Sequence, residues 1–452
     1  MPDTERMHKT WIHSGRFVPK TFVRPIQAFI QIESSAGGLM LAAALLAIWL
    51  ANSSHYPAYQ DFLNTPISVG FGDWSLQLTL MQFINDGLMA VFFFVVGLEV
   101  KHSLILGDLR DPKAAALPLI GALGGMIFPA FVYLMIVRGF EPASAGWGIP
   151  IATDIAFSIG VLSMLGRRVS SGAKIFLLTL AVADDLGGIL VIAFFYTTSL
   201  SGVWLSLGLG GLLAVHVASR AGIRSHIYYI PMAVVVWYCF LMSGVHATIA
   251  GVALAFLTPA LPMYGVKELD VKARMILDTY PAEDETPLLR EQSDYEAFEL
   301  AEIARESTAP LVRYKRRLTV WSSFIVIPVF ALANAGVNFG ETGIKTSSFQ
   351  KLALATGVGL VLGKTVGISL FSWLAVKLGI ARLPESTTWR QMIGVAATAG
   401  IGFTVALFIT ALAFSDPGMS AAAKIGIFAG SIVSGLIGVT ILLSERKPVV
   451  SN

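Results

Sequence analysis

The stretch TLAVADDLGGILV, residues 179–191, sets two adjacent aspartates in the middle of an apolar run that covers residues 173–196. About 20 apolar residues are enough for one helix to cross the ~30 Å hydrocarbon layer of a membrane. Ionisable groups at that depth are costly, so Asp184 and Asp185 are candidates for a functional site. The stretch therefore predicts a membrane-spanning helix built around a pair of carboxylates.

The composition of the whole chain agrees with a membrane protein. Of its 452 residues, 55% are hydrophobic and only 13% are charged, whereas a soluble protein carries roughly 25% charge. The mean hydropathy is +0.71. One cysteine, Cys239, excludes an internal disulfide framework and a multi-cysteine metal site. We expect an all-α polytopic membrane protein.

Apolar stretches of spanning length predict twelve transmembrane helices. The stretch 227–261 is too long for one span, and Pro231 with Ser243–Gly244 divides it into two. With the N-terminus inside, 27 of the 32 Lys and Arg residues fall on the cytoplasmic side, which fits the positive-inside rule. The basic balance is thus explained by topology, and no nucleic-acid partner is expected. The predicted spans are residues 33–53, 79–101, 114–137, 144–165, 173–196, 202–220, 227–242, 245–261, 319–339, 353–376, 391–414 and 421–443.

The remaining segments are predicted to lie outside the membrane. Residues 1–32 lack the apolar region of a signal peptide and are expected to be a cytoplasmic tail, as are residues 444–452. Residues 64–77 predict an extracellular β-hairpin, with an irregular loop as the alternative. Residues 262–318, between spans 1–8 (33–261) and spans 9–12 (319–443), are expected to form a polar cytoplasmic loop with helical patches, solvated and partly disordered.

Asp184 and Asp185 are the predicted ion site. Neighbours on a helix point about 100° apart, so the two carboxylates can both touch one water-filled cleft but cannot face each other. Two close carboxylates repel, which favours the binding of a proton or of a hard cation such as Na+ with oxygen ligands. Competition between proton and cation is the chemistry of an exchanger. The alternative is a pair that neighbouring helices satisfy for structural reasons.

Two spans carry helix-breaking residues. Pro150 precedes Thr153 and Asp154 in IPIATDIAF, and Gly400 and Gly402 precede Thr404 in ATAGIGFTVALF. Paired interruptions in the two halves of a transporter point to a binding site near the bilayer midplane. The alternatives are a simple capping role for the aspartate and close helix packing for the glycines.

Four further ionisable residues are candidates. Lys364, in LVLGKTVGISL, is the one lysine at mid-membrane depth of the predicted spans, and Asp184 is its expected partner. Asp86 and Glu99 lie near opposite ends of a span, where solvated helix ends are the alternative. His246, in SGVHAT, is either a packing histidine or a titrating group.

These motifs together resemble the NhaA family of bacterial sodium/proton antiporters. The likeness runs from about residue 33 to 447 and includes INDGLMAVFFFVVGLEVK, IPIATDIAFSIGVL, AVADDLGGILVIAFFYT, SGVHATIAGV, ALANAGV, GKTVGISLF and GIGFTVALFI in order. The family is itself a known example of paired broken helices in inverted repeats, so that feature is not independent support.

The resemblance implies a role for each candidate. Asp184 and Asp185 would be the ion-binding pair and proton carriers, with Lys364 the coupled lysine. Residues Thr153, Asp154, Gly400, Gly402 and Thr404 would form the broken-helix site, spans 3–5 and 10–12 being inverted repeats. Asp86, Glu99 and His246 would be accessory residues, the last two linked to pH response. The hairpin at 64–77 would join two copies into a homodimer.

The chain departs from the family before the ninth span. Family members carry a glutamate and two histidines there, where this chain has Lys315, Arg316 and Thr319; a second family glutamate is Ser103. Arg stays charged at any biological pH and cannot itself sense pH. Clustered positive charge repels protons, so we expect activity to begin at lower pH than in members with the histidines.

The sequence therefore predicts an antiporter of the inner membrane that expels Na+, and also Li+, in exchange for protons by alternating access. It would be electrogenic and serve pH homeostasis, with no catalytic residue and no cofactor. A sodium-coupled symporter of related fold is the alternative. An intramembrane aspartyl protease is disfavoured, because its two aspartates must face each other from different helices.

Overall fold

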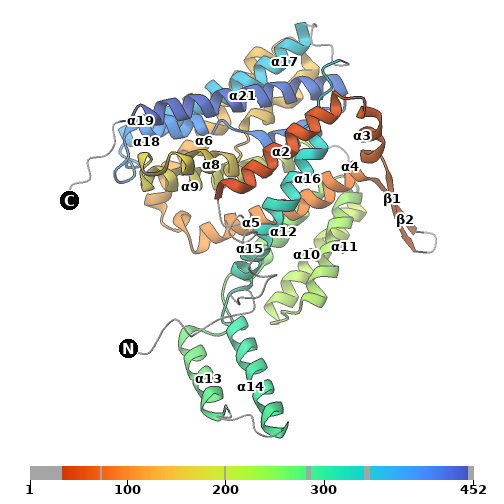
Figure 1. Ribbon diagram of the computed structural model, residues 1–452, viewed down its shortest axis with the longest axis vertical. Helices are drawn as coiled ribbons and strands as arrows, with labels where there is room; N and C mark the ends of the chain where they lie inside the picture. Colours follow the sequence, from red (N-terminus) through yellow and green to blue (C-terminus); the bar gives the residue numbers. More distant parts are fainter. Residues whose placement is uncertain (1–32, 72–73, 198–199, 281–286, 341–346, 446–452) are drawn as a thin grey trace. The chain divides into compact units, whose positions relative to one another are not determined.

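The computed structural model describes residues 33–71, 74–197, 200–280, 287–340 and 347–445. These residues are mostly helical, with one small sheet (Figure 1). The chain divides into two compact units: residues 1–89, 111–197 and 320–452 form the first, and residues 90–110 and 198–319 the second. The predicted tail 1–32 lies outside the described residues, and the tail 444–452 is described only as far as Glu445.

Three long helices of the first unit begin at side-chain caps. Asp111, Ser170 and Asp416 each accept a hydrogen bond from a backbone N–H of the helix that follows, and a proline comes first in two of these helices. The helical elements of this unit are α2 (Glu33–Ala51), α3 (Tyr56–Leu63), α4 (Leu80–Gln82), η3 (Phe83–Leu88), α6 (Pro112–Ile136), α7 (Glu141–Ser144), η5 (Ala145–Ile151), α8 (Ile155–Met164), η6 (Gly166–Arg168), α9 (Ser171–Phe195), η7 (Ser322–Val326), α16 (Ile327–Asn334), α17 (Ser347–Val358), η8 (Gly359–Gly363), α18 (Lys364–Lys377), α19 (Trp389–Thr398), α20 (Phe403–Ala413) and α21 (Pro417–Leu443).

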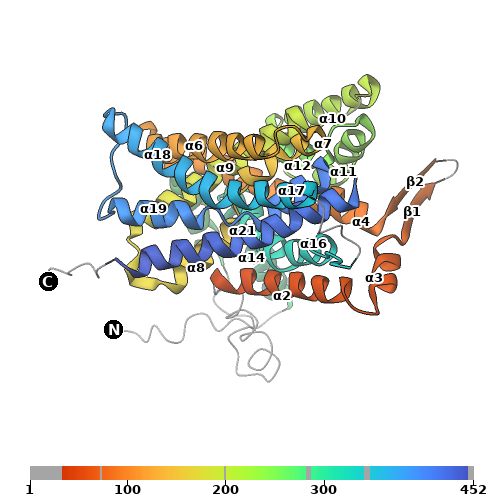
Figure 2. The same cartoon turned by 90° about the horizontal axis from the view of Figure 1, so that it is seen from above.

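Small residues allow close helix packing in the first unit. α6 runs beside α18, and α17 beside α21 (Figure 2). A Cβ added at Gly124 would strike the carbonyl of Gly367, and one added at Gly367 would strike the carbonyl of Gly124. Backbones that approach this closely gain packing contacts where lipid offers no hydrophobic driving force. The buried cluster that includes Phe176, Leu180 and Ile368 joins α9 and α18 in the same region.

Two spans of this unit are broken, as predicted. The pair Glu141–Ile151 and Ile155–Met164 bends by 46°, and the pair Trp389–Thr398 and Phe403–Ala413 also bends by 46°. Pro150 lies at the end of η5, where it can donate no backbone hydrogen bond. Both breaks leave free backbone groups that other side chains must satisfy.

The predicted β-hairpin is present. Strands β1 (Pro66–Phe71) and β2 (Trp74–Thr79) pair antiparallel, with Pro66 opposite Thr79. The strands cover residues 66–71 and 74–79, so they begin and end two residues later than the predicted 64–77. Its extracellular position and its role in a dimer stay predictions.

The second unit is also helical. Its elements are α5 (Met89–Ile105), η4 (Asp108–Arg110), α10 (Gly202–Arg220), α11 (His226–Ser243), α12 (Ala247–Leu257), α13 (Val266–Thr279), α14 (Pro287–Glu306) and α15 (Pro310–Trp321). The first residue of α5 and the last two residues of α15 belong to the first unit. The predicted division of residues 227–261 into two helices is present at Ser243–Gly244: α11 ends at Ser243, and Gly244 after it has φ +81°. Pro231, the other predicted point of division, lies inside α11. On α5, Lys101 Nζ donates to the carbonyls of Phe256 and Thr258 at the end of α12.

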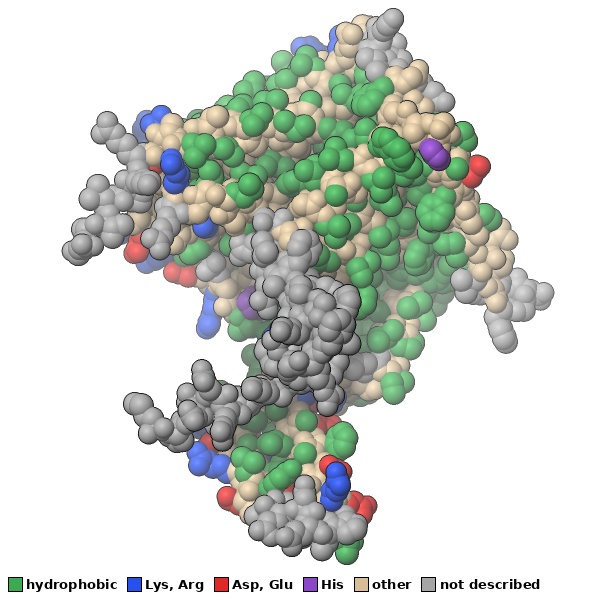
Figure 3. Space-filling model, in the orientation of Figure 1, with side chains coloured by type: hydrophobic (Ala, Val, Ile, Leu, Met, Phe, Trp, Pro, Cys, Tyr) green, Lys and Arg blue, Asp and Glu red, His purple; other side chains and the backbone are tan. Residues whose placement is uncertain are grey.

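The helical patches expected in residues 262–318 are present in the described part of this segment, where they are long, packed helices. α13 and α14 form an antiparallel pair of helices, and α15 begins at Pro310, before the predicted start of the ninth span. Ile276 and Ile303 are buried, each at 8% exposure. Charged side chains of both signs gather on the α13–α14 pair in Figure 3, whereas apolar side chains cover much of the first unit's surface.

Length and apolar composition identify seven described helices that can cross a membrane, or ten if each of three bent pairs is one span. Two shorter apolar helices, Ile227–Ser243 and Ala247–Leu257, fall below the length of a full span. The chain is therefore a multi-pass membrane protein, and the predicted number of twelve spans is not established by these lengths.

Candidate ion-binding site

Asp184 lies at the middle of α9 in the first unit. Its side chain is 1% exposed, and that of Lys364, the first residue of α18, is 0% exposed. Lys364 Nζ and Asp184 Oδ2 are 2.5 Å apart. The predicted ion pair is present. A charged pair this deep is stable only when its groups have partners, because desolvation of each ion is costly.

The two oxygens of Asp184 have different surroundings. Oδ2 accepts hydrogen bonds from Lys364 and from the hydroxyl of Thr153, at 2.8 Å. Oδ1 is buried and has no hydrogen-bond partner among the described residues. A Cβ added at Gly125 would lie 3.6 Å from Oδ1, so the glycine keeps the space beside this oxygen small but open. One oxygen is thus held, and the other can accept a proton or ligate a cation.

Asp154 joins the two broken helices. Its Oδ1 accepts from the backbone N–H of Phe157 and so caps α8. Its Oδ2 accepts from both the backbone N–H and the hydroxyl of Thr404, at 3.2 and 2.7 Å. Its backbone N–H donates to the carbonyl of Ile401. One buried carboxylate therefore stabilises the positive N-terminal ends of both α8 and α20, which is more than the simple cap considered above.

Hydroxyl groups donate hydrogen bonds to the carbonyls at the second break, two of which, those of Ala397 and Thr398, also accept from the backbone N–H groups of Gly400 and Ile401. Three consecutive carbonyls, of residues 397, 398 and 399, accept hydrogen bonds at 2.7–2.9 Å from Ser434, Ser158 and Thr153 respectively. A fourth hydroxyl, that of Ser431, accepts from the backbone N–H of Gly402. The sequence analysis did not identify the three serines. The spacing of Ser431 and Ser434 on one face of α21 is the only signal that could have indicated them.

The glycines of the second break are needed for close approach. A Cβ added at Gly400 would strike Ser434 Oγ and the carbonyl of Leu360, and one at Gly402 would lie 2.8 Å from the side chain of Leu360. Leu360 belongs to η8, a π-helical turn that ends one residue before Lys364. π-Helical turns are rare in proteins, and many of those that occur lie at functional sites. The second break, η8 and the lysine therefore pack as one assembly.

Thr153 connects this assembly to Asp184. Its hydroxyl lies within hydrogen-bond distance of both Asp184 Oδ2 and the carbonyl of Ala399, at 2.8 and 2.9 Å. A hydroxyl has a single proton to donate. Thr153 can therefore serve one of these acceptors at a time, which links the state of Asp184 to the second break.

Asp185 follows Asp184 on α9 and is 9% exposed. Both predicted carboxylates are thus buried in the first unit, on adjacent positions of the same helix. Among the sequence-predicted site residues, the structure brings together Asp184, Lys364, Thr153, Asp154, Gly400, Gly402 and Thr404.

Comparison with known proteins shows the family of the chain. Residues 27–442 match the family model described as Na+/H+ antiporter 1. The chain is 43% identical to the Na(+)/H(+) antiporter NhaA of Oleidesulfovibrio alaskensis, over 94% of this chain and 95% of that protein. It is 42% identical to the NhaA of Acidithiobacillus ferrooxidans, over 94% and 98%. The chain belongs to the NhaA family. A solved sodium proton antiporter, MjNhaP1 of Methanocaldococcus jannaschii, matches at 12% identity and a TM-score of 0.46, over 93% of this chain and 98% of its own.

The predicted accessory residues, Asp86, Glu99 and His246, lie on other helical elements than the carboxylate pair. Asp86 lies in η3, a second π-helical turn, and is half-buried. In the second unit, His246 is the N-cap residue of α12 and is half-buried. Glu99 lies on α5 with 37% of its side chain exposed and forms an ion pair with Lys315 at 3.3 Å. Lys315 is one of the residues at which the sequence analysis expects a departure from the NhaA pattern, and it contacts Glu99, a predicted accessory residue.

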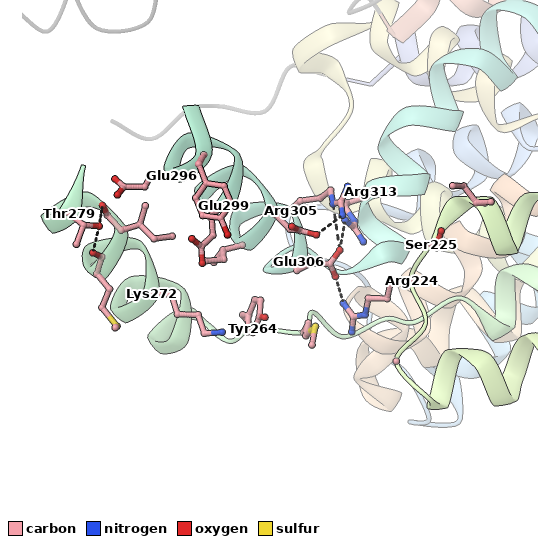
Figure 4. Close-up of a pocket in the computed structure, with 18 residues that line it drawn as sticks. Arg224, Ser225, Tyr264, Lys272, Thr279, Glu296, Glu299, Arg305, Glu306 and Arg313 are labelled. Carbon is pink, nitrogen blue, oxygen red and sulfur yellow. Dashed lines mark hydrogen bonds and ion pairs between the residues drawn. The ribbon is translucent and has the colours of Figure 1, made fainter. Parts of the chain in front are cut away.

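The second unit also holds a groove between α13, α14 and the segment after α10 (Figure 4). At its inner end the buried carboxylate of Glu306 lies 3.0 Å from Arg224 and 3.5 Å from Arg305 and Arg313. Glu306 thereby ties the base of α14 to α15, the helix that carries Lys315. The sequence analysis identified no site in this segment, because a run of acidic and basic residues does not indicate which side chains form ion pairs.

Proposed function

We propose that this protein exchanges Na+ for protons across a membrane, with Asp184 and Asp185 as the groups for which the two ions compete. The observation that carries the proposal is the divided environment of Asp184, with Oδ2 bound by Lys364 and Thr153 and Oδ1 without a partner in the described structure. A buried carboxylate oxygen of this kind can bind a hard monovalent cation. The relatives named Na+/H+ antiporters support the same assignment.

Charge balance suggests how the ions are coupled. Without Na+, each carboxylate of the pair can hold a proton, and Lys364 is the partner of Asp184 Oδ2. When one Na+ binds to both carboxylates, Asp184 and Asp185 each release a proton. Two protons then exchange for one Na+, which makes transport electrogenic. Since Thr153 can donate to only one acceptor, cation binding at Asp184 also frees its hydroxyl for the carbonyl of Ala399.

The finer features of the proposal follow the sequence analysis. We infer twelve spans, and the seven long helices, three bent pairs and two shorter apolar helices support this number. We infer alternating access around the paired breaks, inverted repeats in spans 3–5 and 10–12, both termini in the cytoplasm, and residence in the bacterial inner membrane. Li+ transport, a role in pH homeostasis, a homodimer formed through β1 and β2, and the absence of a cofactor are parts of the same proposal.

We also propose an altered pH response. Lys315 contacts Glu99, and Arg316 and Arg317 follow it on α15. This positive charge repels protons at that end of the protein, so exchange should begin at lower pH than in members with histidines there. Family membership favours an antiporter over the symporter alternative, which would also need a clamp for an organic substrate.

The experiment uses inverted membrane vesicles that carry the protein and a pH-gradient dye. Addition of Na+ or Li+ should dissipate the proton gradient, and choline should not. Vesicles with Asp185→Asn should give no Na+ response although the protein is folded and present in equal amount. Failure of Na+ to act at any pH between 6.5 and 9 would refute the proposed function.

A further inference from the structure

A second buried polar cluster lies at the end of α16, away from the residues used above. Asn334, the last residue of this helix, is 1% exposed. Its Nδ2 donates to Asn85 Oδ1 at 2.8 Å and to the carbonyl of Phe330 at 3.1 Å. Its Oδ1 is buried and has no hydrogen-bond partner among the described residues. A buried oxygen in this state costs free energy unless something binds it.

The groups around Asn334 are mainly acceptors. α16 ends here, and the carbonyls of a helix's last turn carry partial negative charge. The hydroxyl of Tyr59 lies 2.6 Å from the carbonyl of Leu332 and 3.3 Å from that of Ala333, but it has one proton for the two. Asn85 precedes Asp86 in η3, which packs against α16. Amide, carbonyl and carboxylate oxygens are the ligands that hard cations prefer.

The cluster adjoins the transport site through packed side chains. Phe330, one turn before Asn334, packs against Phe408 of α20, with ring centroids 6.3 Å apart. Phe408 lies one turn after Thr404, which donates to Asp154. Both helical segments that meet at Asn334 contain a π-helical turn: η3 contains Asn85, and η7 directly precedes α16. Such turns are frequent at functional sites in helices.

We propose that Asn334 Oδ1, with Asn85 and Asp86, forms a second, weaker station for the transported monovalent cation. The inference rests on the proposed function and extends it. One carboxylate and neutral oxygens bind Na+ less tightly than the pair on α9. A weak station suits a path, because an ion must leave it as readily as it enters.

Two substitutions of Asn334 separate this role from a structural one. Asn334→Leu keeps the branched shape but removes the oxygen, and should raise the apparent KM for Na+ about fivefold, the value of one lost hydrogen-bond-like contact. Asn334→Asp adds charge and should lower the apparent KM. A structural role predicts the reverse order, since aspartate loses both donors to Asn85 and Phe330 and gains repulsion from their oxygens.

The decisive measurement removes the main site. In an Asp184→Asn, Asp185→Asn background, adding Asn334→Asp should give a Tm that rises with Na+ but not with choline, and adding Asn334→Leu should abolish any rise. Asn52 is the matched control: it holds the segment after α16, donating to the carbonyl of Val337, and its Oδ1 already accepts from Phe339. Asn52→Asp should give no Na+-dependent rise.

The results separate the two proposals. Wild-type vesicles that ignore Na+ would refute the proposed function. Two results would refute the second station alone, provided that the wild type exchanges ions: a Tm of the Asn334→Asp variant that does not depend on Na+, or an equal rise of Tm in Asn52→Asp. In that case a water molecule is the partner of Asn334 Oδ1.

Discussion

Removal of Lys364 tests the ion pair at the centre of the site. The side chains of Lys364 and Asp184 are 0% and 1% exposed and meet at 2.5 Å. Lys364→Ala strands a buried carboxylate whose remaining described donor is Thr153. Breaking a buried pair from one side costs about 3–5 kcal/mol of unfolding free energy. The loss should shrink at low pH, because a protonated Asp184 needs no counter-charge.

Asp184→Asn in the same protein should restore part of that loss. The amide keeps the shape of the carboxylate and removes the stranded charge, so the double variant should be more stable than the two single losses predict. We expect a coupling of about 1–3 kcal/mol, the range found for residues in direct contact. Thermal unfolding in detergent, without Na+ and at fixed pH, measures all four proteins of the cycle.

Lys377→Ala is the matched control. Lys377 ends the same helix, is exposed, and its Nζ lies 4.6 Å from the centre of the Trp373 ring. Its loss removes a lysine from α18 without stranding a buried acid, and it should be additive with Asp184→Asn. Additivity of Lys364→Ala and Asp184→Asn to within about 0.5 kcal/mol would refute the pair as an energetic unit.

Three further predictions concern transport. Asp185→Asn should abolish Na+-driven proton movement in vesicles while the protein elutes from a sizing column like wild type; near-normal Na+ affinity would contradict the role given to this residue. Thr404→Val should destabilise the protein by about 1–2 kcal/mol and impair exchange, because it removes the hydroxyl that donates to Asp154 between the two broken helices. Thr404→Ser keeps this hydroxyl and should retain both stability and exchange. Equal behaviour of the two variants in unfolding and dye assays would contradict this role of the hydroxyl. Lys315→Glu combined with Arg316→His and Thr319→His should move the onset of activity to higher pH in dye assays stepped from pH 6 to 9; an unchanged profile would show that this segment does not set the response.

The part of the site that sequence predicts is the part that breaks a rule of membrane composition. Carboxylates in an apolar run, a lone lysine at depth, and prolines or glycines inside spans are each unusual enough to be noticed. The pairing of Lys364 with Asp184 follows from them, because a buried cation needs an anion and few are present.

Serine and asparagine give no such signal. Ser158, Ser431 and Ser434 form hydrogen bonds with the backbone at the second break, and Asn334 ends α16. Serine and asparagine are common in membrane helices and can bond to their own backbone. Their partners are set by packing between elements far apart in the sequence. Distances and burial are needed to identify them.

For residues 262–318 the sequence predicted helical patches but not that they pack against each other. The charge content of this segment is typical of solvated chain, yet α13 and α14 bury Ile276 and Ile303. A few apolar residues at helical spacing are sufficient when two short helices pack against each other. Composition alone could not distinguish this pair from a disordered loop.

Proton release on Na+ addition to the purified protein tests the central claim most directly. In weakly buffered detergent solution, Na+ added to wild type should acidify the medium in proportion to the protein, with up to two protons released per molecule by the charge balance proposed above, and choline should not. Asp184→Asn with Asp185→Asn should release none. Sodium binding without proton release, or equal release from the double variant, would contradict competition of the two ions at this pair.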